Sequence, residues 1–441
     1  MYQTISFDDK RRLISFDMQN RFIFSPFRLR DSSSGCWGKH LLLSAHYLNK
    51  MKPRILMLTH QCAGVGGSYM RAVSLARPLI EMGYDMTLIA SRAYPGLTTR
   101  KSDWHGVHII EMPDILPWRI RNAGLSPIDL ASRLTHVWRG HYDLFHIFDH
   151  RPAASLPALW RLNQNIPVVS DWSDLWGFEG FSEHRHEFMS VFLKWIDNSL
   201  EPYVHNKGSA VTAISEDLKK RATQLKVPSE RVLLTQVGSN SDIIRPMDKA
   251  ESRIKYGIPL DCPVVAYCGF SSLDMELLVD SFLKLVRLIP NVYLIMTGAQ
   301  IPAFDEVMRQ HGTNQQVRHF GAVPYEQLGE ILSCGDVMLL PYLNTTVNIA
   351  RFPNRFGEYL AAGRPIATNR VGDHAVIVEQ EQIGIATRPD AQSFAEGIAS
   401  LLEMPNQLDE MGKRARLLAE TRFTWKAIAA PVAKLYAELI G

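Results

Sequence analysis

The sequence has no apolar run long enough to cross a membrane. Among its 441 residues we find no stretch of about 18 consecutive apolar residues, the length a spanning helix requires. The first 20 residues also lack the apolar core of a secretory signal. These absences argue against an exported or membrane-spanning protein. They predict a cytoplasmic one, with a peripheral position at the inner membrane face as the alternative.

Cysteine is scarce and scattered. The chain has 5 cysteines, none of them in a CxxC pair: Cys36, Cys62, Cys262, Cys268 and Cys334. An odd number without paired spacing argues against a disulfide framework and against a zinc site. We therefore expect reduced thiols.

A dinucleotide-binding fingerprint is also missing. The glycines at Gly64, Gly66 and Gly67 do not have GxGxxG spacing, and Ala90 and Ser91 stand where an acidic residue would close the next strand. A nicotinamide cofactor is therefore not favoured. The simplest interpretation of the glycines is a tight strand-to-helix turn that requires positive φ.

Composition and length indicate a globular protein of two domains. Hydrophobic residues make up 46% and charged residues 21%, which excludes a disordered chain. A chain of 441 residues exceeds one ordinary core. Residues 1–250 carry 31 Lys and Arg against 24 Asp and Glu, whereas residues 251–441 carry 17 against 21. The excess of basic residues in the N-terminal part is compatible with an anionic substrate or an acidic membrane surface.

Strands alternate with helices in two similar blocks. Residues 1–50 show no sustained period and are expected to be an N-terminal extension. The first block predicts strands at 54–59 and 86–90 around a helix at 69–82, and the second predicts strands at 263–268 and 291–297 around a helix at 275–288. This alternation predicts two doubly wound, Rossmann-like α/β domains facing across a cleft. Their expected bounds are 51–245 and 246–422, with a last helix over 423–441.

Residues 350–368 hold the most informative motif. Pro353 is suited to the first turn of a helix that also contains Arg355, and Glu358 follows three residues later on the same face. A helix N-terminus attracts anions, so Arg355 could clamp a diphosphate while Glu358 accepts hydrogen bonds from ribose hydroxyls. The alternative is a surface Arg–Glu pair of little consequence.

This segment, FPNRFGEYLAAGRPIATNRVG, resembles the donor-site signature of family 4 glycosyltransferases, the glycosyl transferases of group 1, which have the GT-B fold. GGSYMRAVSLARPLIEMGYDMTLIA, VTAISEDLKKRA, HFGAVPYEQLGEILSCGDVMLLP and FTWKAIAAPVAKLYAEL follow in family order, so the resemblance covers residues 52–441. It implies retaining transfer of a sugar from a nucleotide-diphosphate donor to an acceptor hydroxyl of a polysaccharide, a lipid or a small glycoside. It also implies no metal and no cofactor besides the donor. We expect a nucleotide sugar and a glycan or lipid-linked acceptor as partners, peripheral membrane contact as an option, and no nucleic acid.

The resemblance also implies which residues hold the donor. The family glutamate that matches Glu358 binds the ribose, and the last helix crosses back onto the N-terminal domain. The implied donor-binding residues are Arg355, Glu358, Gly269, Phe270, Ser271, Val323, Pro353 and Asn354. The glycine loop of Gly64, Gly66 and Gly67 is implied to line the cleft near the diphosphate and the acceptor.

The sequence departs from the family pattern at two points. Ala350 stands where many members have a glutamate that contacts the donor sugar, and Phe270–Ser271 stand where they have cations for the diphosphate. Arg355 is therefore expected to be the principal cation, with Arg351 as its helper. The departures keep two alternatives open besides a transferase: a sugar-nucleotide epimerase of the same fold and a non-catalytic binding subunit.

Acidic and histidine residues at strand ends are the catalytic candidates. Many family members have a catalytic histidine after the strand at 168–170, where this chain has Asp171 and Trp172. Asp171 or Asp174 could orient the acceptor hydroxyl or accept its proton, and His150 is a third candidate. Trp172 and Trp176 could stack on a sugar ring, whereas a metal site built from His146, Asp149 and His150 is not favoured. The alternative for the carboxylates is ordinary turn and N-cap use.

Overall fold

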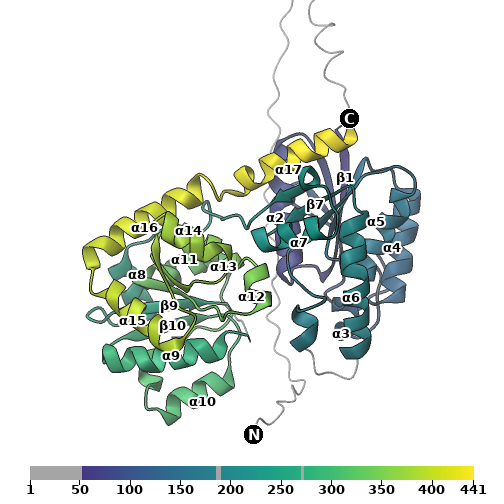
Figure 1. The fold of residues 1–441 in the computed structure, drawn as a ribbon. Coiled ribbons are helices and arrows are strands. Elements are labelled where there is room, and N and C mark those ends of the chain that lie inside the picture. Colours follow the sequence, from purple (N-terminus) through teal and green to yellow (C-terminus); the bar gives the residue numbers. More distant parts are fainter. Residues whose placement is uncertain (1–51, 185–189, 270–272) are drawn as a thin grey trace, which may run out of the picture. The chain divides into compact units, whose positions relative to one another are not determined.

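The computed structural model describes residues 52–184, 190–269 and 273–441. The chain divides into one unit at Met1–Met51 and a second at Lys52–Gly441. The predicted N-terminal extension, Phe270 and Ser271 lie outside the described residues. Both sheets of the fold belong to the second unit (Figure 1).

The first sheet has 8 strands in the order β3-β4-β2-β1-β5-β6-β7-β8. The strands are β1 (Arg54–Cys62), β2 (Asp85–Ser91), β3 (Arg100–Trp104), β4 (Val107–Glu111), β5 (Leu144–Phe148), β6 (Val168–Trp172), β7 (Ala210–Ala213) and β8 (Val232–Leu234). β3 pairs antiparallel with β4, and the other pairs are parallel. β5 and β6 are buried along their whole length, as strands covered on both faces must be.

Helices cover both faces of this sheet and connect its strands. They are α2 (Gly67–Glu81), α3 (Trp118–Asn122), α4 (Pro127–Arg139), α5 (Pro152–Leu162), α6 (Ser190–Lys207) and α7 (Glu216–Gln224), with short 3-10 turns η1 (Phe181–His184) and η2 (Ser229–Arg231). Ser126 and Ser215 cap α4 and α7 by accepting hydrogen bonds from the backbone N–H groups of Asp129 and Leu218.

The second sheet has 6 parallel strands in the order β11-β10-β9-β12-β13-β14. They are β9 (Val264–Cys268), β10 (Tyr293–Thr297), β11 (Val317–His319), β12 (Val337–Leu340), β13 (Ile366–Asn369) and β14 (Gly384–Thr387). The prediction of two doubly wound α/β domains is therefore confirmed. All carboxyl ends lie at one edge of such a sheet, where ligands bind in folds of this type.

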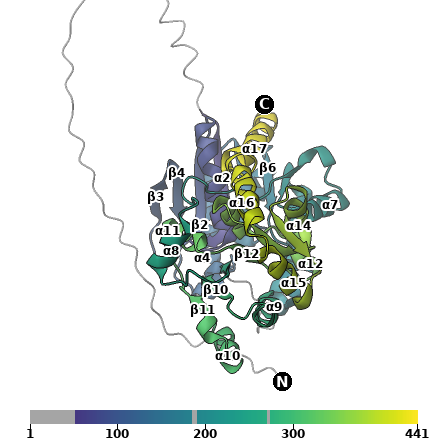
Figure 2. The ribbon, with the colours of Figure 1, turned by 90° about the vertical axis from the view of Figure 1, so that its left-hand side faces the viewer.

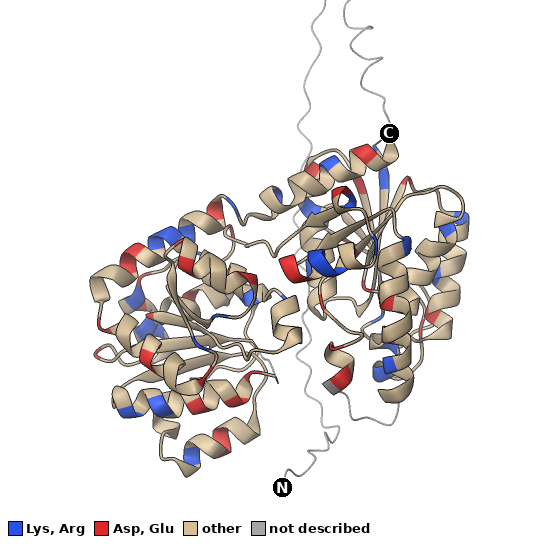
Figure 3. Cartoon of the chain, in the orientation of Figure 1, with Lys and Arg blue, Asp and Glu red and all other residues tan. Residues whose placement is uncertain are grey.

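The second sheet is also flanked by helices. They are α8 (Lys249–Tyr256), α9 (Met275–Leu288), α10 (Pro302–Gln310), α11 (Tyr325–Ser333), α12 (Thr346–Ala350), α13 (Asn354–Ala361), α14 (Gly372–Gln380), α15 (Ala391–Leu402) and α16 (Pro405–Glu420), with a 3-10 turn η3 (Asn314–Gln316). Figure 3 shows Lys and Arg interspersed with Asp and Glu on the helices around both sheets.

The last helix, α17 (Trp425–Ile440), packs on the first sheet rather than the second. Figure 1 and Figure 2 both show it beside α2, and Ala429 and Val432 belong to the same apolar cluster as residues of that helix. The Tyr436 hydroxyl lies 2.6 Å from His146 Nδ1 in β5. Among the helices that the structure describes, none combines the length and apolarity that crossing a membrane requires.

Candidate functional site

Helix α13 presents the predicted donor residues at the carboxyl edge of the second sheet. Its Tyr359 hydroxyl accepts a hydrogen bond from Cys268 N at 2.9 Å and donates one to Leu339 O at 3.1 Å, which fixes the helix to β9 and β12. Pro353 was expected inside the first turn, but it occupies the N-cap position with extended ψ of 130°. The helix therefore begins at Asn354, and Arg355 still lies in its first turn.

Glu358 lies half-buried on α13 beside the end of β9. The Cys268 thiol donates a hydrogen bond to its Oε2 at 3.5 Å. Burial raises the pKa of Glu358, while the Cys268 hydrogen bond and the charge of Arg355 oppose the rise. A carboxylate in this position is a strong acceptor for hydroxyl groups that replace the lost water.

Arg355 is the positively charged side chain of α13 that could bind an anion. Its guanidinium carbon lies 4.8 Å from the centroid of the Tyr267 ring, a cation–π contact that orients the side chain. Arg351, its predicted helper, forms an ion pair with the buried Asp274. Asp274 therefore neutralises much of the Arg351 charge, and Arg355 contributes more of the positive charge at the site.

The glycine loop leads from β1 into α2 and reaches the donor helix. Gly64 and Gly66 have φ of 78° and 90°, as the predicted turn requires, whereas Gly67 already begins α2. A Cβ on Gly66 would lie 2.1 Å from Gln61 Oε1. A Cβ on Gly67 would lie 3.5 Å from Asn354 Nδ2, so this loop and the start of α13 are in contact.

The remaining donor candidates occupy loops of the second sheet. Gly269 follows β9 with φ of 80°, and Gly298 approaches it so closely that a Cβ would lie 3.0 Å from the Gly269 backbone. Val323 is half-buried before α11 and packs against the main apolar cluster. Ala350 is fully buried, and its carbonyl accepts a hydrogen bond from Ser215 Oγ.

Asp171 is buried at the end of β6 in an ion pair. Arg71 of α2 donates to both of its carboxylate oxygens, each at 2.9 Å, and Thr212 Oγ1 donates to Oδ2 at 2.7 Å. The same guanidinium donates to the carbonyls of Thr235 and Gln236. With its oxygens thus engaged, Asp171 is better suited to hold α2 on the sheet than to accept a proton.

Asp174 lies in the loop after β6, half-buried. Glu201 of α6 anchors this loop, because its carboxylate accepts hydrogen bonds from Trp176 N and Gly177 N at 2.9 and 2.7 Å. Burial, followed by the negative charge of Asp149, raises the pKa of Asp174 to about 7. A carboxyl group that titrates near neutral pH is suited to exchange a proton with an acceptor hydroxyl.

Two of the remaining candidates, His150 and Trp172, are held by contacts within the protein. His150 Nε2 lies 2.7 Å from Asp197 Oδ1, and the same carboxylate accepts a hydrogen bond from Arg151. Trp172 is buried, with its ring stacked on His205 at 4.2 Å between centroids, so one face of the ring is occupied within the protein.

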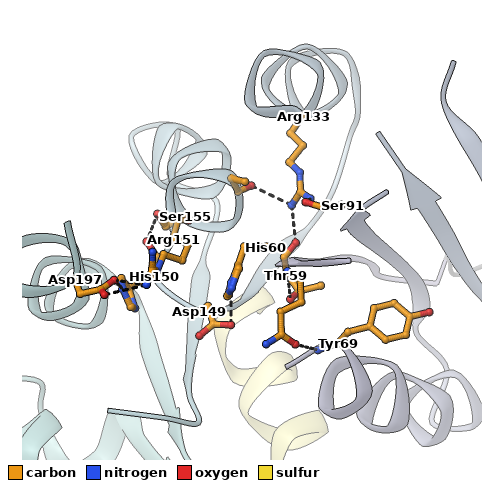
Figure 4. A network of polar contacts seen from close by, with 12 residues as sticks. Thr59, His60, Tyr69, Ser91, Arg133, Asp149, His150, Arg151, Ser155 and Asp197 are labelled. Atoms are coloured by element: carbon orange, nitrogen blue, oxygen red, sulfur yellow. Dashed lines mark hydrogen bonds and ion pairs between the residues drawn. The ribbon is translucent and has the colours of Figure 1, made fainter. Parts of the chain in front are cut away.

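A buried His60–Asp149 pair was missed by the sequence analysis. His60 Nδ1 of β1 lies 3.0 Å from Asp149 Oδ2, directly after β5 (Figure 4). His146, Asp149 and His150 each meet different partners and do not converge on one point. The available signal was that both His60 and Asp149 follow the apolar core of a predicted strand.

Comparison with known families assigns both halves of the chain. A family model described as "Glycosyl transferase 4-like domain" matches residues 66–238. A second model, described as "Glycosyl transferases group 1", matches residues 248–418.

Curated relatives and solved structures agree with these matches. The chain is 26% identical over 396 residues to the D-inositol 3-phosphate glycosyltransferase of Thermobispora bispora, covering 85% of this chain and 90% of the relative. It is 23% identical over 335 residues to the alpha-D-kanosaminyltransferase of Streptomyces kanamyceticus, covering 74% and 82%. Sucrose-phosphate synthase from Thermosynechococcus elongatus superposes with a TM-score of 0.71 at 18% identity, covering 88% of this chain and 99% of that one. The Anabaena protein HepE in complex with UDP-glucose superposes with a TM-score of 0.65 at 16% identity, covering 87% and 99%.

Proposed function

Because the chain belongs to the glycosyl transferases of group 1 and has the GT-B fold, we propose that α13 holds the donor: Arg355 the diphosphate and Glu358 the ribose. The protein is a glycosyltransferase that moves a sugar from a nucleotide-sugar donor. One observation carries the assignment: Arg355 and Glu358 share one helix, whose start contacts the glycine loop of the first sheet.

The leaving diphosphate needs positive charge as the glycosidic bond to it breaks. Arg355 and the N–H groups at the start of α13 supply this charge, and we infer that they do so in place of a metal ion. The glycine loop lies next to the same helix start, because Gly67 is close to the Asn354 side chain. We infer that the anomeric configuration is retained, so the acceptor attacks from the face on which the diphosphate leaves.

Asp174 is the residue we assign to the acceptor hydroxyl. Its loop belongs to the first sheet, and Glu201 fixes the backbone on its C-terminal side. At neutral pH a carboxyl group with a pKa of about 7 is partly ionised, so it can accept a hydrogen bond or a proton from the hydroxyl.

Exposed aromatic rings favour a glycan or lipid-linked acceptor. Phe192 and Trp195 are 49% and 65% exposed on α6, and their rings stack with centroids 6.2 Å apart. Phe178 is 65% exposed in the loop that follows Asp174. Such rings can stack on sugar rings or meet an apolar chain at a membrane surface.

Proton NMR of the donor distinguishes this function from its alternatives. UDP-glucose, GDP-mannose and ADP-glucose are each incubated with the protein, with and without D-inositol 3-phosphate or glucose as trial acceptors. We expect one donor to lose its anomeric signal faster with an acceptor, and a new anomeric signal of a retained α-linkage. The H1–H2 coupling identifies this linkage for a glucosyl product, and the one-bond C1–H1 coupling identifies it for a mannosyl product. Epimerised donor in the absence of acceptor would contradict transfer. Unchanged spectra in every mixture, together with failure of each donor to bind, would favour a non-catalytic subunit.

A further inference from the structure

We propose that Asp149, held by His60, is a positioning residue of the transfer reaction, which fixes the glycine loop and places a negative charge beside Asp174. This role rests on the proposed function, because the glycine loop and Asp174 are parts of the same site. Asp149 is 5% exposed, so it acts through its neighbours rather than on the substrate.

The sheet itself brings His60 and Asp149 together. Thr59 of β1 pairs with Phe148, the last residue of β5. The residues that follow this pair, His60 and Asp149, therefore lie side by side at the point where β5 ends. Their side chains are 6% and 3% exposed and meet at 3.0 Å. Gly124 packs against the pair's histidine, since a Cβ there would lie 2.6 Å from His60 Cβ (Figure 4 shows the ring beside Asp149).

The Asp149 backbone is strained. Its φ is 92°, a value that residues other than glycine rarely adopt. Residues persist in such conformations when their surroundings hold them, and they cluster at functional sites. The chain turns here from β5 toward α5, with the carboxylate facing His60 of β1.

The strand that carries His60 connects Asp149 to the glycine loop. The next residue, Gln61, accepts a hydrogen bond at Oε1 from Tyr69 N in the first turn of α2, at 3.2 Å, and its side chain lies against Gly66. Burial opposes the ionised carboxylate, but the neighbouring His60 ring holds the pKa of Asp149 well below its usual range. Asp149 thus positions the strand end from which the glycine loop starts, and this loop lies next to the donor helix.

The charge of Asp149 also acts on Asp174. The lowered pKa keeps Asp149 ionised, and Asp149 follows β5, the parallel neighbour of β6, so its charge lies at the same sheet edge as the loop of Asp174. After burial, this charge is the strongest influence that raises the pKa of Asp174. Glu201 of α6 and Asp171 of β6 raise it further, and Arg351, which follows α12, lowers it.

Infrared titration of the protonated carboxyl group tests the charge without any ligand. The carboxyl band of Asp174 is identified by its absence from the spectrum of Asp174→Asn. In the wild type this band should titrate with a midpoint near pH 7. Removing a neighbouring negative charge favours ionisation, so in Asp149→Asn the midpoint should fall by about one unit. Asp129→Asn is the matched control, because Asp129 is equally buried in an ion pair with Arg133 on α4. An unchanged midpoint in Asp149→Asn would overturn the proposal.

Hydrogen exchange tests whether Asp149 holds the glycine loop in place, and this test also needs no ligand. We expect faster amide exchange over residues 61–70 in Asp149→Asn, which weakens the contact with His60, than in Asp129→Asn. Equal exchange in both variants would overturn this part of the role.

Turnover in the NMR assay separates this inference from the proposed function. We expect the Asp149→Asn rate to fall by about tenfold or more relative to Asp129→Asn at equal folded fraction. Absence of wild-type turnover would count against the proposed function alone. Wild-type turnover that Asp149→Asn retains would count against the positioning role.

Discussion

Replacing Arg71 by methionine is expected to lower the free energy of unfolding by about 3–5 kcal/mol, the cost of breaking a buried ion pair from one side. Arg71 is 2% exposed and provides both hydrogen bonds from α2 to Asp171. Methionine fills similar space but leaves the carboxylate and the Thr235 and Gln236 carbonyls without these donors. Urea denaturation followed by circular dichroism measures the change.

Arg77 provides the matched control on the same helix. Its ion pair with Asp242 spans 3.4 Å, and the two side chains are 38% and 56% exposed. Water competes for such a pair, so Arg77→Met should cost less than about 1 kcal/mol. Similar losses in Arg71→Met and Arg77→Met would show that the buried pair does not hold α2 on the sheet.

Replacing Arg355 by methionine is expected to weaken nucleoside diphosphate binding by about 10–100-fold. A hydrogen bond to a charged group contributes about 1.5–3 kcal/mol, and each 1.4 kcal/mol is tenfold in affinity. The effect should be large because Phe270–Ser271 stand where the family pattern has cations and because Arg351 is paired with Asp274. Calorimetric titration with UDP, GDP and ADP measures it.

The phosphate specificity of the effect distinguishes Arg355 from a general packing residue. Affinity for the nucleoside alone should change little in Arg355→Met, since the ribose is assigned to Glu358. Arg370→Met serves as the control, because Arg370 is an exposed arginine of the same lobe paired with Glu379. Equal losses for nucleoside and diphosphate would contradict the assignment of Arg355 to the phosphates.

Sequence patterns predicted the buried elements of the fold and missed the exposed ones. The helix at 275–288 has the predicted bounds, and the strand at 263–268 differs from β9 by one residue, because their apolar patterns are strong. β3 was missed, since its residues are polar and four of five are exposed at the sheet edge. β8 and β14 are short and only partly buried, so their patterns resemble loops.

The site was predictable only where its residues are close in sequence. Arg355 and Glu358 lie within one helical turn, so spacing and family resemblance both indicated them. The His60–Asp149 pair depends on strand order, because β1 and β5 become neighbours only when the sheet forms. Likewise, Arg71 meets Asp171 across 100 positions of sequence, so no local pattern indicated this ion pair.

The most direct measurement of the central claim is a thermal-shift comparison of the wild type with Glu358→Gln. Both proteins are screened against UDP-, GDP-, ADP- and dTDP-sugars, with the exposed Glu379→Gln as a control of equal charge change. We predict that one nucleotide class raises the melting temperature of the wild type and of Glu379→Gln but not of Glu358→Gln. We also expect the unliganded melting temperatures to be nearly equal. An equal ligand-induced shift in Glu358→Gln would contradict the assignment of the donor ribose to Glu358.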